Sequence, residues 1–159
     1  MGRPVQIVTN SLTIAQLAAS SKETDLILIG GYVYPRTGVA LGPLAISMMQ
    51  GLRVRRAILG AGGIVPEGVY NSNLLLVETE RQMMACGQDV TIVADHSKFG
   101  RLSLAFLCNL DAIRDLVVDP GVSAGDRAML EAAGVTVHLS PPPDESNGTP
   151  RANGARTEA

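Results

Sequence analysis

Residues 89–100 read Asp-Val-Thr-Ile-Val-Ala-Asp-His-Ser-Lys-Phe-Gly, and this stretch carries the pattern that decides the fold. Its apolar, β-rich residues 90–94 predict a buried strand, and the strand ends at Asp95. Ser97, Lys98 and Gly100 follow within five positions. Open α/β sheets bind ligands just beyond the carboxyl ends of their strands. A lysine at that place suits an anionic oxygen of a phosphate or carboxylate. The alternative interpretation is an ordinary surface loop with one solvated lysine.

Strand-like and helix-like stretches alternate on both sides of this segment. Near-continuous Val/Ile/Leu strands with intervening helices predict an α/β fold, in which a mostly parallel sheet has helices on both faces. The first helix has an apolar face through Ile14, Leu17 and Ala18 and an N-cap at Asn10 or Ser11. Strands are predicted at 5–9, 26–29, 56–59, 90–94, 116–118 and 135–139, and further helices at 44–50, 74–84 and about 124–133.

The composition restricts the class of protein. A chain of 159 residues with 46% hydrophobic content can bury one sizeable core. Its net charge of −2 does not match a nucleic-acid backbone. No signal peptide or membrane-spanning stretch is visible, so we expect a soluble, cytoplasmic protein without a membrane partner. Cys86 and Cys108 are far apart and outside any Cys-x-x-Cys pair, which favours two buried thiols over a disulfide or a zinc site.

The last stretch of the chain differs from the rest. Residues 141–159 have no apolar periodicity and begin with three prolines. Such a segment cannot bury enough surface to offset the entropy of ordering it. We therefore predict one folded domain over residues 1–140 and a disordered tail over residues 141–159.

Polar and glycine-rich positions recur where the predicted strands end. Hydroxyl, amide and backbone N–H groups would meet there at a helix N-terminus, which favours anions. Taken singly, each position has a plainer explanation as an N-cap or as a turn glycine. Together with Lys98 they predict a cleft for a small phosphorylated or carboxylated ligand. The strand-end positions are Thr9, Asn10, Ser11, Gly30, Gly31 and Gly60.

Catalytic groups are scarce by comparison. His96 and His138 are the only histidines, and Glu78 and Glu80 point about 200° apart on a helix. Asp95 is the best acid or base candidate, although it also suits the capping of the following turn. We predict no catalytic residue, no metal site and no cofactor.

Five motifs then give a specific resemblance. In order, they are Val8-Thr9-Asn10-Ser11-Leu12, Leu28-Ile29-Gly30-Gly31, Leu41-Gly42-Pro43-Leu44-Ala45, Leu59-Gly60-Ala61-Gly62-Gly63-Ile64 and Ala94-Asp95-His96-Ser97-Lys98-Phe99-Gly100. This series resembles the effector-sensing domain of the DeoR family, bacterial transcriptional regulators of sugar metabolism. The resemblance covers residues 5–139 approximately. It implies a Rossmann-like sheet similar to those of ribose-5-phosphate isomerase and glucosamine-6-phosphate deaminase, and a sensor that binds a phosphorylated sugar.

The resemblance has a departure at the N-terminus. Members of the family usually begin with a winged helix-turn-helix and a first strand that ends in an Asp-x-Gly-Thr-Thr loop. This chain starts after both, so it is expected to be an N-terminally truncated sensor. DNA would be contacted only through a helix-turn-helix that the chain lacks. The family also implies a homo-oligomer, either a dimer or a tetramer.

A second departure lies among the cleft residues. Family members commonly have aspartate where this chain has Gly62, and lysine where it has Glu80. Asn73 and Glu78 match the family pattern. The resemblance therefore implies Asn73, Glu78 and Lys98 as ligand contacts and favours sensing over turnover.

Two alternatives to a sensor remain open at this point. One is a sugar-phosphate isomerase or deaminase, which would have only Asp95, His96 and Glu78 as proton-transfer groups. The other is a dimerisation module with a vestigial pocket, with the apolar helix segment 74–77 as its interface.

Overall fold

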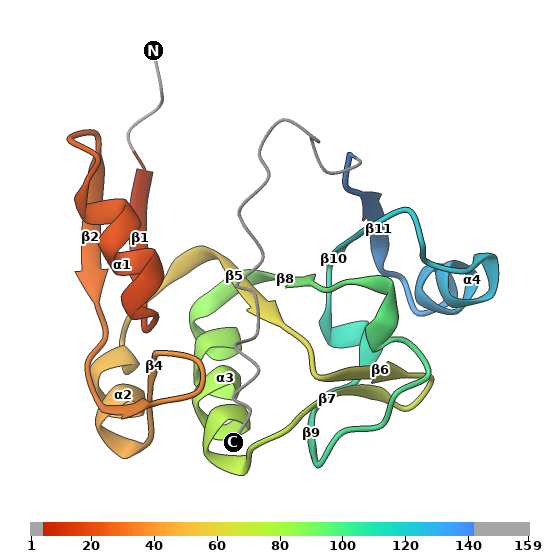
Figure 1. Cartoon of the computed structure of the whole chain (residues 1–159), viewed down its shortest axis with the longest axis horizontal. Helices are drawn as coiled ribbons and strands as arrows, with labels where there is room; N and C mark the ends of the chain where they lie inside the picture. The colour runs from red at the N-terminus through yellow and green to blue at the C-terminus, as the bar shows by residue number, and fades with distance from the viewer. Residues whose placement is uncertain (1–4, 142–159) are drawn as a thin grey trace, which may run out of the picture.

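The computed structural model describes residues 5–141, and the sheet with the most strands in it is a four-stranded parallel sheet (Figure 1). Its order is β11-β10-β8-β5, and every neighbouring pair is parallel. The parallel sheet predicted from the Val/Ile/Leu runs is confirmed. Apart from Pro141, the predicted tail lies outside the described residues. The four strands are β5 (Val54–Gly60), β8 (Gly87–Val93), β10 (Asp115–Val118) and β11 (Thr136–Leu139).

A second, two-stranded sheet is formed by β1 (Val5–Thr9) and β2 (Thr24–Leu28), again parallel. Helix α1 (Leu12–Ala19) connects them and begins at Ser11, whose hydroxyl accepts the N–H of Ile14. The apolar face predicted for this helix is wrong in part. Ala15 and Ala18 are buried, whereas Ile14 and Leu17 are 48% and 72% exposed, because the short helix rests on its alanine side.

The sequence patterns did not predict the antiparallel strands. One hairpin joins β3 (Tyr32–Tyr34) to β4 (Val39–Leu41). The other antiparallel sheet contains β6 (Gly63–Val65), β7 (Gly68–Asn71) and β9 (Ala105–Cys108). These strands have three or four residues each, which is too short for a period of two to stand out.

Three further helices pack against these sheets. Helix α2 (Pro43–Met49) has its proline in the first turn, as predicted. Helix α3 (Leu74–Cys86) is capped by Asn73, and α4 (Ala124–Ala132) is capped by Ser123. Short 3-10 turns, His96–Lys98 and Leu110–Ala112, follow β8 and β9. None of the helices within residues 5–141 has the length and hydropathy needed to cross a bilayer.

Helix α3 connects two hydrophobic clusters. Val77 belongs to the larger cluster, which includes Leu59, Ile92 and Leu116 from the four-stranded sheet. Cys86, at the other end of the helix, belongs to a smaller cluster. In that cluster it packs with Ile29, Ala45 and Met49. Both cysteines are buried free thiols, as the sequence predicted.

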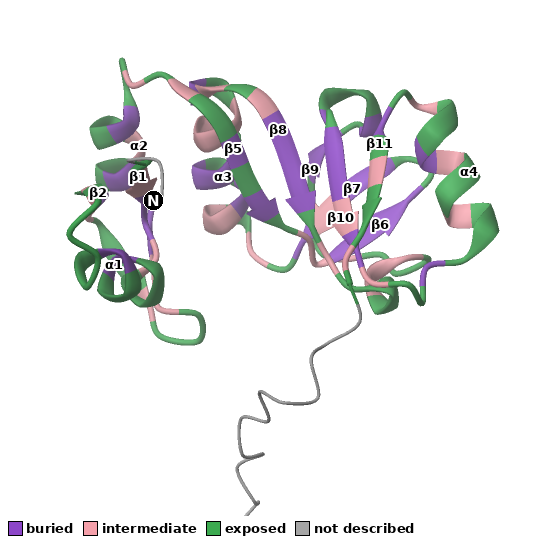
Figure 2. Cartoon of the chain, turned by 90° about the horizontal axis from the view of Figure 1, so that it is seen from above, coloured by how far each residue is buried: buried purple, intermediate pink, exposed green. Residues whose placement is uncertain are grey.

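Helices lie on both faces of the molecule but do not cover every strand. Figure 2 shows α1 and α2 on opposite sides of β1 and β2, and α3 beside β5. On the four-stranded sheet, the face opposite α3 exposes Ile58 and Val93, by 60% and 47%. The prediction that helices flank the parallel sheet is confirmed, while Ile58 and Val93 show that the cover is incomplete.

Candidate functional site

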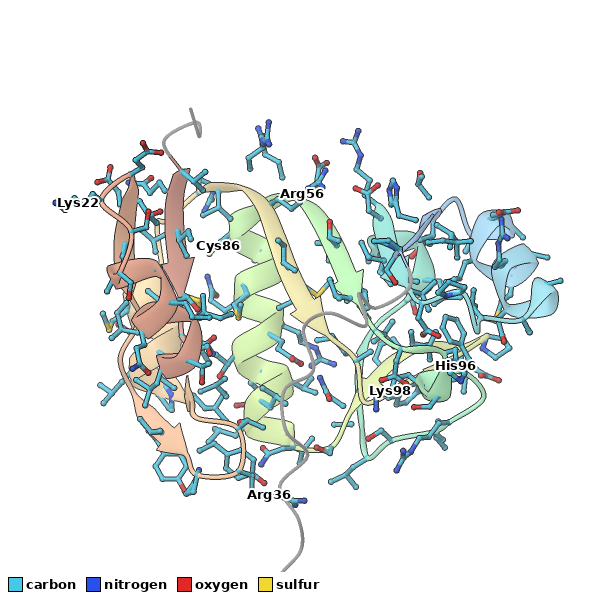
Figure 3. The ribbon with its side chains drawn as sticks, turned by 45° about the horizontal axis from the view of Figure 1, so that its top comes forward. Lys22, Arg36, Arg56, Cys86, His96 and Lys98 are labelled. Carbon is cyan, nitrogen blue, oxygen red and sulfur yellow. The ribbon has the colours of Figure 1, made fainter. Side chains whose placement is uncertain are left out.

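The carboxyl ends of β1, β2, β5 and β8 bring most of the predicted ligand residues to one edge of the fold. Figure 3 shows Lys98 and His96 at this edge, with Arg36 from the β3–β4 turn also near it. Arg56 and Lys22 lie at the opposite edge. Parallel strands place their carboxyl ends together, so this arrangement follows from the topology. Arg36 adds a positive charge that the sequence patterns did not single out.

Residues 9–11 form the turn from β1 into α1. The Thr9 hydroxyl accepts the N–H of Ser11 at 3.1 Å. The Asn10 side-chain nitrogen donates to the Ala40 backbone carbonyl at 2.8 Å, and the Asn10 backbone carbonyl accepts the Ala40 N–H at 2.7 Å. Thr9 and Asn10 are buried. Asn10 therefore anchors the β3–β4 hairpin, and its role toward a ligand stays a prediction.

The two glycines after β2 have different surroundings. Gly31 has a φ of +147°, and a Cβ there would lie 2.8 Å from the Leu41 carbonyl oxygen. A Cβ on Gly30 would meet only the Met48 sulfur, at 3.6 Å. Gly31 is therefore required by the backbone itself, whereas Gly30 has room for a side chain.

Replacing Gly31 by alanine is expected to destabilise the fold by about 2 kcal/mol, because the substitution adds both strain and a backbone clash. Gly30→Ala is the matched control and should change stability little. Urea unfolding of both variants measures the difference. Equal midpoints for the two variants would mean that Gly31 has no special backbone role.

A buried carboxylate, not predicted as a site residue from the sequence, lies near this edge. Glu80, only 6% exposed, accepts hydrogen bonds from the Asn71 side-chain nitrogen at 3.0 Å to each oxygen. Burial raises the pKa of Glu80 to about 7, while the Asn71 hydrogen bond opposes that rise. A Cβ on Gly62 would lie 2.8 Å from the Asn71 side-chain oxygen. The two positions that depart from the family pattern, 62 and 80, are thus joined through Asn71.

Glu78 and Asn73 belong to the same helix and its cap, but neither is hydrogen-bonded to the Glu80 carboxylate. Glu78 is exposed, in agreement with the expectation that it points away from Glu80. The Asn73 side-chain oxygen caps α3 by accepting the N–H groups of Leu75 and Leu76, at 2.8 and 3.2 Å. Both residues stay predictions as ligand contacts.

Asp95 and Lys98 form one polar cluster after β8. The Asp95 carboxylate accepts the Ser97 hydroxyl and backbone N–H, and it lies 3.5 Å from the Lys98 ammonium. The Ser97 hydroxyl is the main cause that lowers the pKa of Asp95, with a smaller contribution from Lys98. Asp95 is therefore an ionised cap of the turn, and the Lys98 side chain remains 30% exposed.

The two histidines are each paired with an aspartate. His96 Nδ1 lies 2.6 Å from Asp119, which also accepts the His96 backbone N–H at 2.6 Å. His138 Nε2 lies 2.8 Å from Asp115 at the start of β10. The described residues contain no group of three or more His, Cys, Asp or Glu side chains arranged to hold a metal ion.

A groove of about 780 Å³ opens between β1 and β5 and reaches this edge. Of the predicted ligand residues, it includes Thr9, Asn10, Ser11 and Gly60, and Glu80 lies in its wall. Gly30, Gly31, Asn73, Glu78, Asp95 and Lys98 lie outside its lining. The predicted set is therefore divided between the groove and the surface beside it.

Comparisons with known proteins agree with the resemblance found in the motifs. The family described as the DeoR C terminal sensor domain matches residues 1–120. The HTH-type transcriptional regulator IolR of Bacillus subtilis is 32% identical over 114 residues, which cover 71% of this chain and 45% of that protein. The HTH-type transcriptional regulator UlaR of Shigella dysenteriae is 25% identical over 138 residues, which cover 86% of this chain and 54% of that protein. The chain thus spans about half the length of these curated relatives.

Proposed function

The chain belongs to the DeoR family through its C-terminal sensor domain, and on this premise we propose that it senses a phosphorylated sugar for a transcriptional repressor of carbohydrate metabolism. The family match over residues 1–120 carries the proposal. The naming of similar proteins as HTH-type transcriptional regulators supports it. DNA would be bound by a helix-turn-helix outside this chain, in a cytoplasmic homo-oligomer.

The parallel sheet supports the finer part of the proposal. A Rossmann-like fold related to phosphosugar isomerases and deaminases would place the effector at the carboxyl ends of β1, β5 and β8. Residues 1–140 would then form the effector-binding domain, followed by the tail. Lys98 would neutralise the phosphate, and the hydroxyl and amide groups at residues 9–11 would accept and donate hydrogen bonds to the sugar. Ligand-induced closure of this edge would change the geometry of the oligomer.

The pairing of the polar residues does not favour the enzyme alternative. His96 is held by Asp119, and Asp95 is held by Ser97 and Lys98. His138 bonds to Asp115, which also contacts Arg56 at the opposite edge. The similar proteins are regulators by name. In the dimerisation alternative, the predicted interface 74–77 is exposed at Leu74 but buried at Val77, so Val77 is not available to a partner.

A thermal-shift measurement with sugar phosphates tests the proposal. Millimolar glucose 6-phosphate, fructose 6-phosphate and ribose 5-phosphate are compared with the same sugars without phosphate. A ligand at about 100 times its dissociation constant stabilises by about 2.7 kcal/mol, so we expect a rise in Tm of about 5 °C or more with at least one phosphosugar.

Variants at two lysines make this test specific. Lys98→Ala should lose most of the shift, and its own stability should change little because the Asp95–Lys98 pair is at the surface. Lys22→Ala removes a lysine at the opposite edge and should keep the shift. No shift with any phosphosugar, or equal shifts in both variants, would contradict the proposed effector site.

A further inference from the structure

Glu80 is a buried carboxylate that has no cationic partner among residues 5–141. Its side chain is 6% exposed, and both of its oxygens accept from a single nitrogen, that of the Asn71 side chain. No lysine, arginine or histidine in this part of the chain forms an ion pair with it. A carboxylate can accept about four hydrogen bonds. At least half of the accepting capacity of Glu80 is therefore unused.

The neighbouring cation on α3 is directed elsewhere. Arg81 donates from Nε to the Leu107 carbonyl at 3.2 Å and from its terminal nitrogen to the Phe106 carbonyl at 2.7 Å. Burial raises the pKa of Glu80 to about 7, whereas a cation close to the carboxylate would lower this pKa. The described part of the chain therefore leaves the charge of Glu80 uncompensated.

Glu80 lines the groove at the edge that we assign to the effector. The same lining includes residues 9–11 and Gly60. These positions stand at the carboxyl ends of β1 and β5. A ligand bound at these two strand ends would therefore lie beside Glu80.

The turn that carries Lys98 is held close to this carboxylate. The Gly100 N–H donates to the Ile64 carbonyl at 2.9 Å, which fixes the turn against β6. A Cβ on Gly62, just before β6, would lie 2.8 Å from the side-chain oxygen of Asn71. The lysine turn and the pair formed by Asn71 and the buried carboxylate thus both border the start of β6. One small ligand at this edge could meet a positive and a negative side chain.

The two departures from the family pattern change the charge at this position. Family members commonly have aspartate and lysine where this chain has Gly62 and Glu80. Aspartate and lysine are oppositely charged and cancel, whereas glycine and ionised glutamate leave one negative charge. A ligand with one additional positive charge would compensate for that difference.

We propose that the effector of this chain is a phosphorylated amino sugar, whose ammonium group pairs with Glu80 while its phosphate lies at Lys98. The inference rests on the proposed function, because it concerns the effector of the same site. An ammonium group supplies the hydrogen-bond donors that the carboxylate lacks, and its charge offsets the cost of burying Glu80. A sugar hydroxyl supplies one donor and no charge.

Isothermal titration calorimetry of the whole chain near neutral pH tests the inference with matched ligands. Glucosamine, galactosamine and mannosamine 6-phosphates are compared with glucose, galactose and mannose 6-phosphates. Each pair differs only in an amino or a hydroxyl group at one carbon. N-Acetylglucosamine 6-phosphate keeps the nitrogen without its charge. We expect at least one amino sugar phosphate to bind about tenfold or more tightly than its hydroxyl counterpart, because charge-assisted hydrogen bonds are the stronger class.

Glu80→Gln separates the ammonium contact from the rest of the site. Glutamine keeps the size of the side chain and can still accept from Asn71, but it carries no charge. The preference for the amine should fall to about twofold or less, and the hydroxyl sugar phosphates should still bind. Glu131→Gln is the matched control, because it removes a carboxylate that is 58% exposed on α4. This control should keep the full preference.

The possible results separate this inference from the proposed function. Equal affinity for the amino, hydroxyl and N-acetyl ligands would overturn the inference and leave the phosphosugar sensor supported. A preference for the amine that is unchanged in Glu80→Gln would also overturn it, because the ammonium group would then bind elsewhere. Failure of every phosphosugar to bind would contradict the proposed function and this inference together.

Discussion

Gly63→Ala is expected to cost about 3 kcal/mol or more of folding free energy. Gly63 begins β6 and is buried. A Cβ at this position would overlap the carbonyl oxygen of Arg101 and lie 2.9 Å from the carbonyl carbon. These are backbone atoms, so no change of rotamer relieves the contact. The β6 strand would have to move away from the segment that leads into β9.

Equilibrium unfolding in urea measures this loss, and Gly60→Ala is the matched control. Gly60 ends β5, and a Cβ there would meet no atom within 4 Å. The control should therefore unfold near the midpoint of the unmodified chain. If Gly63→Ala unfolded at the same midpoint as Gly60→Ala, the close approach of Gly63 to Arg101 would be contradicted.

Glu80→Gln is expected to stabilise the chain at pH 8 by up to about 3 kcal/mol and to have little effect near pH 5. Burial raises the pKa of Glu80 from 4.5 to about 7. The folded state therefore binds this proton more tightly than the unfolded state. The corresponding stability is present below pH 4.5 and is lost as the pH rises through about 7. Glutamine remains uncharged throughout, so it removes this pH dependence.

Free energies of unfolding at several pH values between 4 and 9 measure the effect. Glu78→Gln removes a carboxylate from the exposed side of the same helix and should leave the slope with pH unchanged. Two other titratable groups lie near Glu80, namely Cys108 and Arg81. The pKa of Cys108 is raised to about 11, mainly by burial and partly by Glu80, whereas Arg81 lowers it. Parallel pH profiles for the chain and for Glu80→Gln would show that the carboxyl group is not buried as described.

Much of the parallel sheet could be predicted because its strands are long apolar runs. Leu59, Ile92 and Leu116 from three of these strands are buried in one cluster with Val77 of α3 and Leu130 of α4, and a hydrophobic pattern in the sequence indicates such burial. Helix starts were also predictable. Pro43 and Asn73 act locally, through a fixed φ and a side-chain cap.

The rest depends on contacts between distant segments. The β3–β4 hairpin is held by Asn10, 30 positions before Ala40, and no local pattern shows that pairing. The burial of Ile14 and Leu17 was overestimated because apolar periodicity does not show whether a neighbouring element covers the face.

The sequence predicted that the candidate site lies at the carboxyl-terminal edge of the strands, but it did not predict which residues contact one another there. Strand ends at Thr9, Gly60 and Asp95 follow from the topology. The local roles of Asn10 and Asp95 depend on partners that only the folded chain shows. Glu80 was not selected because its burial and its bond to Asn71 arise from packing between α3 and β7.

The labelling rates of the two buried thiols can report how the folded structure opens. Burial raises the pKa of Cys108 to about 11, so almost none of it is the reactive thiolate at neutral pH. Cys108 is also buried, so we expect its alkylation to need local or global unfolding. Cys86 lies in the wall between β1 and β5, and its sulfur lies 3.4 Å from the Met49 carbonyl oxygen. The ratio of the two labelling rates consequently distinguishes a loosening of that wall from unfolding of the whole chain.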